Sequence, residues 1–569
     1  MRSRRTLTAA LALPLLLVTG CVGIPSDSAP QPVAAISEAT PSDGAPQVEA
    51  LGPQGGEQPD EIVRGFLAAS ASNVRSRPSA RLYLTPEAAQ MWADDAGVTV
   101  IAPDTALVPG DDGSQVTLTG RVLGRVDTAG VYVGADESLR QVLSLVQVDG
   151  QWRIGNPPPG VLLRLDVFQR AYVSYNLYFL DPTGTRVVPD PRYLLSGSAA
   201  RANSLVEKLL DGPSPFLADA VRSELDPDVS LVSNVQEVRE VVIDLTGLGE
   251  RSPASLQGLS AQLIWTLKQV SISELTLRSD GKPLTVPGAG GVQTSSDWQA
   301  YGPDVIPADD LGHFVSAGGV WTTDGVPLAG PAGQGTYNLV SAGVSSGQQL
   351  LAGVSAVPGG ATLLIGGYGD ALAPVLSGRS FTPPVWVSLQ QELWTVRDGI
   401  EVVRVPVGAA PQTIISGGLA DGETIRALQV SRDGTRAAVV SGPDGAGELS
   451  VARVVRSGST VQLTGFTRLP TDLRNVVDVS WATSTQLLFL ATDPADGRTK
   501  PWLISVDGAV LRVQSVANLF GALTSIAAAP GRNALVSAAG TMYQLDDLFW
   551  TTLVRGRPFF SGSEPSYPG

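Results

Sequence analysis

The sequence holds a single cysteine, Cys21, and a single histidine, His313, in 569 residues. One cysteine excludes an internal disulfide, and the two counts together exclude metal sites built from several His or Cys ligands. A Ser-His-Asp triad could use only His313, and no Gly-x-Ser-x-Gly turn precedes a helix near it. No Walker motif occurs. We therefore expect no catalytic residues, no metal and no cofactor, and we interpret His313 as a structural residue at the start of the last domain.

Basic charge is also scarce, with 39 Lys and Arg against 54 Asp and Glu and a net charge of −15. Only four of the basic residues are lysine. An acidic chain disfavours nucleic-acid binding, which needs basic patches to neutralise phosphates. Long apolar runs are missing as well, because no stretch after the first 20 residues reaches the length of a membrane-spanning helix.

The first 20 residues read as a signal peptide. "MRSRR" supplies a positive n-region, and "LTAALALPLLLV" supplies an apolar h-region that is too short to span a bilayer. Cleavage before Cys21 removes three arginines and no acid, so the mature chain is still more acidic.

The lone cysteine follows Val18, Thr19 and Gly20, which is the pattern of a bacterial lipobox. Small residues let the chain enter a lipidating enzyme and then a peptidase, and the cysteine thiolate takes the diacylglyceryl group. Two acyl chains satisfy the requirement for stable anchoring. We expect Cys21 to become N-palmitoyl and S-diacylglycerol cysteine. The alternative is a secreted protein with a chance cysteine near its cleavage site.

Residues 21–58 are dominated by Pro, Ser, Gly and Ala and are predicted to be a disordered tether. Residues 59–160 follow as an α+β domain. "PDEIVRGFLAAS" predicts a helix with Pro in its first turn, and "YLTPEAAQMW" a second one capped by Thr85. Alternating strands come next, with Asp149-Gly150 as a hairpin turn. The order resembles nuclear-transport-factor-2-like domains.

Residues 161–290 are predicted to form a second α+β domain. A strand pair, "AYVSYNLYFLDPTGTRVVPDPRYL", precedes the helix "SAARANSLVEKLLDGPS", which stops at Gly212. Ser252 caps a further helix, with Pro253 at its first position. We interpret residues 291–310 as a linker.

Residues 311–556 predict an all-β propeller of five or six blades. Segments of the form strand, polar turn, strand begin about 40 to 50 residues apart, which is the period of one blade. An immunoglobulin-like pair of domains is the alternative, but such domains repeat near about 100 residues. Residues 557–569 are predicted to be a disordered tail.

Several acidic motifs invite a search for carboxylate chemistry, since propellers can carry paired acids. We interpret these motifs as solvated acids. They are Asp94-Asp95, Asp111-Asp112, Asp309-Asp310 and Asp546-Asp547. "SRDGTRAAV" superficially resembles a sialidase Asp-box, but it fits a hairpin turn at Asp433-Gly434 with Ser431 and Thr435 bonding locally. "DPDVS" and "DPADG" match calcium loops only weakly.

Together, these features resemble one family, the actinobacterial lipoprotein LpqB family. The resemblance rests on the lipobox, "CVGIPSDSAPQ", "PDEIVRGFLAAS" and "YLTPEAAQMW", followed by a region similar to the GerMN domain of sporulation proteins, which spans "LYFLDPTGTRVVPDPRYL" to "AQLIWTLKQVSISELTLRSDGKPL". It implies a non-enzymatic accessory protein, lipid-anchored to the cell membrane on its extracytoplasmic face. The implied partner is MtrB, the sensor histidine kinase of the MtrAB two-component system in cell-wall homeostasis and division.

A second hypothesis is a cell-envelope glycan-binding protein or, as a less favoured alternative, a propeller glycoside hydrolase. It would use exposed aromatic residues, for which Trp321, Trp386, Trp394 and Trp481 are the candidates. Packing of these residues in the blade cores is the alternative reading.

Overall fold

The computed structural model describes residues 52–197, 200–236, 238–419, 423–553 and 561–569. The predicted signal peptide, the lipobox and nearly all of the predicted tether lie outside the described residues.

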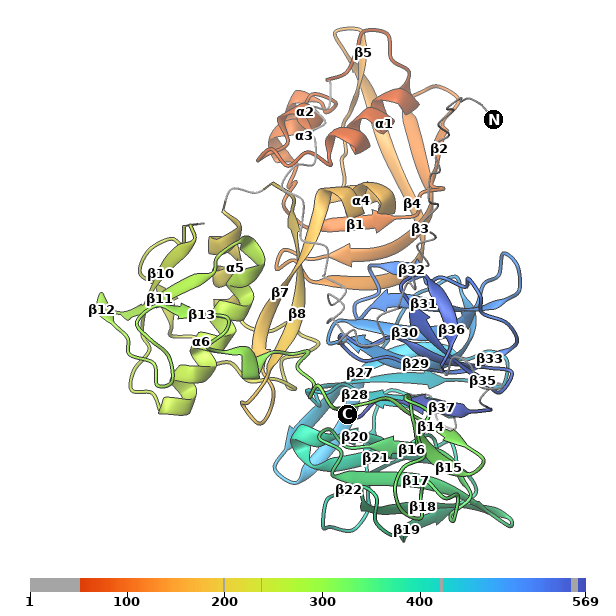
Figure 1. The fold of residues 1–569 in the computed structure, drawn as a ribbon. Coiled ribbons are helices and arrows are strands. Elements are labelled where there is room, and N and C mark those ends of the chain that lie inside the picture. The colour runs from red at the N-terminus through yellow and green to blue at the C-terminus, as the bar shows by residue number, and fades with distance from the viewer. Residues whose placement is uncertain (1–51, 198–199, 237, 420–422, 554–560) are drawn as a thin grey trace, which may run out of the picture.

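The first domain packs helices against a curved sheet (Figure 1). Its helices are α1 (Pro59–Ala69), α2 (Pro78–Arg81), α3 (Pro86–Met91) and α4 (Leu165–Ala171). Its strands are β1 (Val98–Ile101), β2 (Ala106–Pro109), β3 (Gln115–Val126), β4 (Tyr132–Val148), β5 (Gln151–Ile154) and β6 (Val161–Arg164). The sheet order is β5-β4-β3-β1-β6, with β2 also paired to β3.

Local sequence signals explain the ends of these elements. In α1, the Glu61 carboxylate accepts from the Gln58 backbone N–H at 2.7 Å, which completes a capping box. The side chain of Thr85 caps α3, as predicted, by accepting from the backbone N–H of Ala88 at 3.1 Å. Asp149 and Gly150 have φ of 53° and 73°, so they form the predicted tight turn between β4 and β5.

The predicted domain boundary at residue 160 is too early. β6 pairs in parallel with β1, and Phe168 of α4 packs in the core of the first domain. The chain leaves this domain only at Tyr172, because an apolar strand added to the edge of the sheet buries more surface than a linker would.

The second domain opens with a long hairpin, β7 (Tyr172–Leu180) and β8 (Val187–Leu195). The other elements are α5 (Arg201–Leu210), β9 (Ser230–Leu231), β10 (Glu240–Thr246), α6 (Pro253–Leu267), the 3₁₀ turn η1 (Lys268–Val270), β11 (Glu274–Ser279), β12 (Lys282–Pro283) and β13 (Gln293–Thr294). β10 and β11 are parallel and are joined through α6, so they form a β-α-β crossover. Ser252 caps α6, as predicted, with its side chain accepting from the N–H of Ser255.

Helix α6 holds the hairpin through buried polar side chains. The Gln262 amide donates to the carbonyl of Tyr178 at 3.1 Å, and the backbone N–H of Tyr178 donates to the Thr266 hydroxyl at 3.1 Å. These bonds satisfy backbone groups that have no strand partner.

The predicted linker 291–310 is partly wrong. β13 pairs with β11, and Trp298 packs into the core of the second domain just before the turn η2 (Gln299–Tyr301). Only the chain after Gly302 crosses to the third domain.

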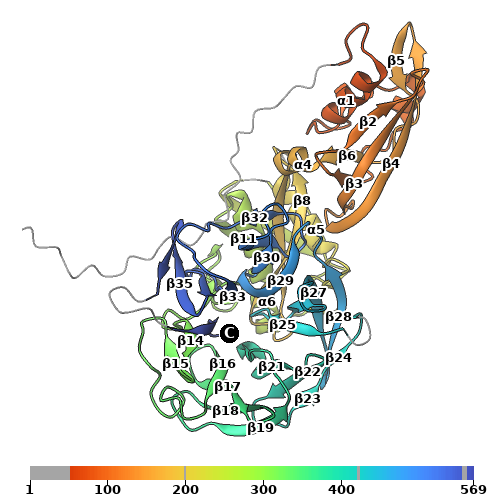
Figure 2. The ribbon, with the colours of Figure 1, turned by 90° about the vertical axis from the view of Figure 1, so that its right-hand side faces the viewer.

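The third domain is a propeller of six sheets, and Figure 2 shows them arranged around the C-terminus. The first blade contains β14 (His313–Ser316), β15 (Gly319–Thr322) and β37 (Ser563–Ser566), and the second contains β16 (Leu339–Val344), β17 (Leu350–Val357), β18 (Gly360–Gly367) and β19 (Ala373–Gly378). The third blade contains β20 (Val385–Val387), β21 (Glu392–Arg397), β22 (Glu401–Pro406) and β23 (Gln412–Thr413). The fourth blade contains β24 (Ile415–Ser416), β25 (Ile425–Val430), β26 (Arg436–Ser441), β27 (Glu448–Ser457) and β28 (Thr460–Arg468). The last two contain β29 (Arg474–Thr483), β30 (Gln486–Thr492), β31 (Thr499–Ser505) and β32 (Leu511–Val513); and β33 (Leu523–Ala527), β34 (Leu535–Ala538), β35 (Thr541–Asp546) and β36 (Phe549–Thr552).

The prediction of a disordered tail over 557–569 is wrong for residues 561–569. There, β37 pairs antiparallel with β14, joining Ser566 to His313 and Ser563 to Val315. The last strand of the chain thus sits in the first blade, beside β14, and closes the ring.

Candidate binding site at the mouth of the propeller

The loops that follow the innermost strands of the blades meet at one mouth of the ring. The innermost strands β37, β16, β20, β25, β29 and β33 contact one another in that circular order. They run in the same direction, so the loops at their ends converge. The converging segments are 345–349, 388–391, 431–435, 484–485 and 528–534.

Residues 303–310, here called the strap, join the second domain to the propeller and lie across this mouth. The Asp304 carboxylate accepts from the backbone N–H and the hydroxyl of Ser484 at 2.7 and 3.3 Å. The buried carboxylate of Asp310 accepts from the Ser346 hydroxyl at 2.8 Å and from the next backbone N–H at 2.9 Å. The two ends of the strap are therefore fixed to different blades.

Two arginines hold the backbone of the strap from either side. Arg186, in the turn between β7 and β8, donates to the carbonyl of Val305 at 2.9 Å. Arg532, in the loop after β33, donates to the carbonyls of Pro307 and Ala308 at 2.9 and 2.8 Å. Side chains of both the second domain and the propeller therefore hydrogen-bond to the strap.

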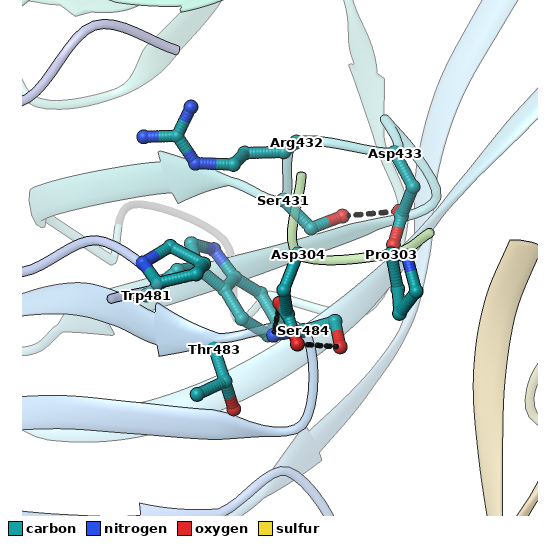
Figure 3. Close-up of a pocket in the computed structure, with 9 residues that line it drawn as sticks. Pro303, Asp304, Ser431, Arg432, Asp433, Trp481, Thr483 and Ser484 are labelled. Atoms are coloured by element: carbon teal, nitrogen blue, oxygen red, sulfur yellow. Dashed lines mark hydrogen bonds between the residues drawn. The ribbon is translucent and has the colours of Figure 1, made fainter. Parts of the chain in front are cut away.

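Arg432 lines a narrow pocket under the strap (Figure 3), together with Asp304, Ser431, Asp433 and Trp481. In the figure its side chain extends away from the hydrogen-bonded turn below it. Across the part of the chain that the structure describes, its guanidinium has neither a hydrogen bond nor an ion pair. Burial lowers the pKa of Arg432 to about 10, against the opposing effect of the nearby strap carboxylates. The side chain as a whole is half-buried, and the carboxylates of Asp304 and Asp310 favour its charged form.

Its neighbour Asp433 has a local role. Its carboxylate accepts from the hydroxyls of Ser431 and Thr435, both at 2.6 Å, and from the backbone N–H of Thr435 at 2.9 Å. This confirms the predicted hairpin turn. Sequence reasoning passed over Arg432 in the same motif, because only the position of this turn at the mouth of the ring distinguishes that arginine.

Two carboxyl groups lie on innermost strands of the ring. Asp478 on β29 accepts from the backbone N–H of Ile526 on β33 at 2.8 Å. Burial and the charge of Glu564 on β37 raise its pKa to about 8, and burial raises the pKa of Glu564 to about 7. Sequence reasoning missed both, since neither belongs to an acidic motif.

His313 is fully buried on β14, at the start of the propeller as predicted. Its Nε2 lies 2.9 Å from the hydroxyl of Tyr368. Burial lowers the pKa of His313 to about 4, so the ring is neutral near pH 7. Within the described ranges no serine hydrogen-bonds to its ring, and its contacts are those of a structural residue.

The aromatic basis of the glycan hypothesis is wrong for three of its four residues. Trp386, Trp394 and Trp481 are 4%, 0% and 6% exposed, and each belongs to a blade core. Trp321 is half-buried beside the core around Phe314. These side chains pack blades together rather than forming a sugar-binding platform.

The acidic pairs are not uniformly solvated as predicted. Asp94 is buried and ion-paired with Arg77 at 2.8 Å and with Arg81 at 2.5 Å, while Asp310 anchors the strap. Asp112 fits the prediction, because it is exposed and accepts from Ser114 in its turn.

Cys21, Val18, Thr19 and Gly20 lie outside the described residues. Among residues 52–569, apart from the gaps given above, no three His, Cys, Asp or Glu side chains gather as metal ligands would. Over the same residues, no helix combines the length and the apolar character needed to cross a bilayer.

The chain is 36% identical over 530 residues to "Lipoprotein LpqB" of Mycolicibacterium smegmatis, covering 86% of this chain and 87% of that protein. It belongs to the LpqB lipoprotein family. The LpqB proteins of Mycobacterium bovis and Mycobacterium tuberculosis are each 32% identical to it, with 97% of both chains covered in either comparison.

Family models divide this chain in the same order as the fold. "Lipoprotein LpqB, N-terminal domain" matches residues 52–169, "Sporulation and spore germination" matches 176–285, and "Lipoprotein LpqB beta-propeller domain" matches 312–568. Among solved structures, the tandem GerMN domains of GerM from Bacillus subtilis are 24% identical, cover 22% of this chain and 47% of that one, and give a TM-score of 0.19.

Proposed function

We propose that this LpqB-family chain is an extracytoplasmic accessory protein, held at the cell membrane by lipid on Cys21, that binds and modulates the sensor histidine kinase MtrB. The proposed role is non-enzymatic. Its place is in two-component signalling for cell-wall homeostasis and division. Family membership and the lipobox motif support the anchor, and the resemblance supports the choice of kinase.

The structural observation that supports this role best is that the three domains meet in one continuous body. Tyr193 on β8 packs its ring against Tyr132 and Phe168 of the first domain, with centroids 5.7 and 5.3 Å apart. Its hydroxyl donates to the carboxyl of Asp507 in the propeller at 3.0 Å. One side chain of the second domain therefore contacts both others.

Further contacts join the propeller to the other two domains. Arg121 of β3 forms a two-pronged pair with Asp472 of the propeller at 2.7 and 2.9 Å. Arg453 of β27 donates to the carbonyl of Pro215 in the second domain at 2.9 Å. A body joined in this way presents surfaces in a fixed arrangement, which suits a scaffold, and its lipid raises its effective concentration near a membrane partner.

The anchor is tested by fractionating cells that express the wild-type chain or Cys21→Ser. We expect the wild type in the membrane fraction and the variant in the soluble fraction, since a serine cannot take the thioether-linked diacylglyceryl group. A variant that stays membrane-bound and processed would contradict the lipobox assignment.

Partner binding is tested by affinity purification of the lipidated full chain from native membranes. We expect MtrB to co-purify with the wild type. Its recovery should fall sharply with Cys21→Ser expressed at the same level, because the tethering effect is lost. If MtrB is abundant in the membranes but is never recovered with the wild-type chain, the partner assignment is wrong.

A further inference from the structure

The outer side of the last two blades carries a group of exposed apolar side chains. Phe520 and Leu548 are 70% and 68% exposed, which places them among the most exposed large apolar residues of the described chain. Three more exposed apolar residues lie near them in the sequence. We call the five together the apolar rim: Val513, Val516, Phe520, Leu548 and Phe549.

The fold brings the two halves of the apolar rim together. β32 and β36 are the outermost strands of neighbouring blades, and Figure 1 shows both on the same side of the propeller. The indole N–H of Trp550 donates to the carbonyl of Ser515 at 2.7 Å, and its backbone N–H donates to the carbonyl of Ala517 at 2.9 Å. The segment that contains Val516 therefore lies against the end of β36.

This part of the rim has a firm support. The side chain of Trp550 is 1% exposed and packs in the core between the two blades, so the exposed ring of the adjacent Phe549 starts from a fixed backbone. Exposed apolar groups of this kind on a folded protein mark a contact with another protein or with a membrane.

We propose that the apolar rim rests against the lipid bilayer, as a second and reversible membrane contact beside the lipid on Cys21. The proposal rests on the proposed anchor. Residues 22–51, the greater part of the predicted tether, separate Cys21 from the first described residue. A flexible chain of that length has a root-mean-square end-to-end distance of about 30 Å, which keeps the folded body close to the membrane surface.

The residue types favour lipid, and the charges around them define the kind of contact. Phe, Leu and Val side chains gain free energy when they leave water for a bilayer. Arg512 and Asp547 are both exposed and stand next to rim residues, so neither sign of charge dominates. We therefore expect binding by burial of apolar surface, with little dependence on salt or on anionic lipid.

The contact would orient the three-domain body on the membrane. A tether alone leaves the body free to turn, whereas a side of the propeller held at the bilayer gives the remaining surfaces a fixed direction toward a membrane partner. A few apolar side chains bind reversibly, so washed membranes should release the chain that lacks the lipid, in agreement with the behaviour expected of Cys21→Ser.

The test is flotation of residues 22–569, made without lipid, with vesicles of phosphatidylcholine in excess. This chain contains the whole described structure and lacks the signal peptide, so its binding does not depend on acylation of Cys21. We expect the wild type to float with the vesicles, and to do so equally at high salt or with phosphatidylglycerol added. A wild type that stays with the soluble fraction, or that floats only with phosphatidylglycerol, overturns the proposal.

The matched variants each replace two exposed apolar side chains. We expect Phe520→Ser combined with Leu548→Ser to lower the vesicle partition coefficient at least about tenfold, because two large side chains no longer leave water on binding. Ile400→Ser combined with Ile415→Ser is the control, since those residues are 59% and 61% exposed on other blades. It should float like the wild type.

Both double variants change exposed positions, and circular dichroism checks their fold. Equal flotation of the rim variant and the wild type, or an equal loss in the control, overturns the proposal. If the rim variant floats normally but recovers less MtrB when lipidated, the rim is a protein interface and the membrane assignment is wrong. Failure of the Cys21 anchor is recognised separately, because it changes cell fractionation and leaves these vesicle results unaltered.

Discussion

The ionisation of Asp478 bears directly on the stability of the fold. Its carboxyl accepts hydrogen bonds from backbone N–H groups of β29 and β33, so it joins two neighbouring blades. Burial raises its pKa to about 8, well above the value of about 3.9 expected in an unfolded chain. Folding therefore takes up a proton between these values, and stability is lost as the pH rises from about 4 to about 8.

Asp478→Asn keeps an acceptor oxygen for β33 and removes the titration. We expect the free energy of unfolding of the wild type to fall relative to this variant by up to about 1.4 kcal/mol per pH unit, the value for one proton. Urea unfolding at several pH values between 5 and 8 measures the difference. Asp324→Asn, at an exposed position, is the control and should parallel the wild type. A constant difference between wild type and Asp478→Asn would contradict the burial of the charge.

At the scale of elements, ring closure by β37 depends on close packing beside it. A Cβ added to Gly562 would lie 2.6 Å from Met542 and 2.7 Å from Phe314, both of which are 1% exposed. We expect Gly562→Ala to lower the free energy of unfolding by about 1–3 kcal/mol, since neither neighbour has room to move.

Gly417→Ala is the matched control, because a Cβ there meets open space and its backbone is not left-handed. It should change stability by no more than about 0.5 kcal/mol. Thermal unfolding of both variants gives the comparison, and equal stabilities would contradict the tight closure of the ring.

The elements that sequence predicted are those with local signals. Thr85 and Ser252 cap helices with their own side chains, and Asp149-Gly150 sets its turn through backbone preference alone. β37 carries no such signal, because "SEPS" becomes a strand only when β14, some 250 residues earlier, offers an edge. The strap is likewise defined by contacts with distant loops.

The candidate site was less predictable than the fold for the same reason. The sequence identified the turn at Asp433 from its side-chain pattern, yet the adjacent Arg432 gains meaning only when six blades bring the turn, the strap and Arg532 together. The tryptophans illustrate the converse, since an aromatic residue on a strand has the same local pattern whether it faces a sugar or a neighbouring blade.

At the scale of the whole molecule, Tyr193 connects all three domains. Burial and the Asp507 carboxyl raise its pKa well above the ordinary value, so the hydroxyl keeps its proton and remains a donor. We expect Tyr193→Phe to lower the free energy of unfolding by about 1–3 kcal/mol, because Asp507 loses a partner in a buried position. Limited proteolysis should cut the variant faster between the domains.

Arg121→Ala is the contrast for that prediction. The Arg121–Asp472 pair also joins two domains, but its side chains are 42% and 69% exposed, and exposed pairs contribute about 0–1 kcal/mol. A larger loss from Arg121→Ala than from Tyr193→Phe would show that the domains are joined mainly at the surface.

We propose that the protein is anchored through Cys21 and acts by contact with its partner. The most direct measurement is the autophosphorylation rate of MtrB in membrane vesicles, with the lipidated wild-type chain, with Cys21→Ser, or with neither. We predict that the wild type changes the rate and that Cys21→Ser at equal concentration has a much smaller effect. A rate that is the same in all three preparations would contradict the account.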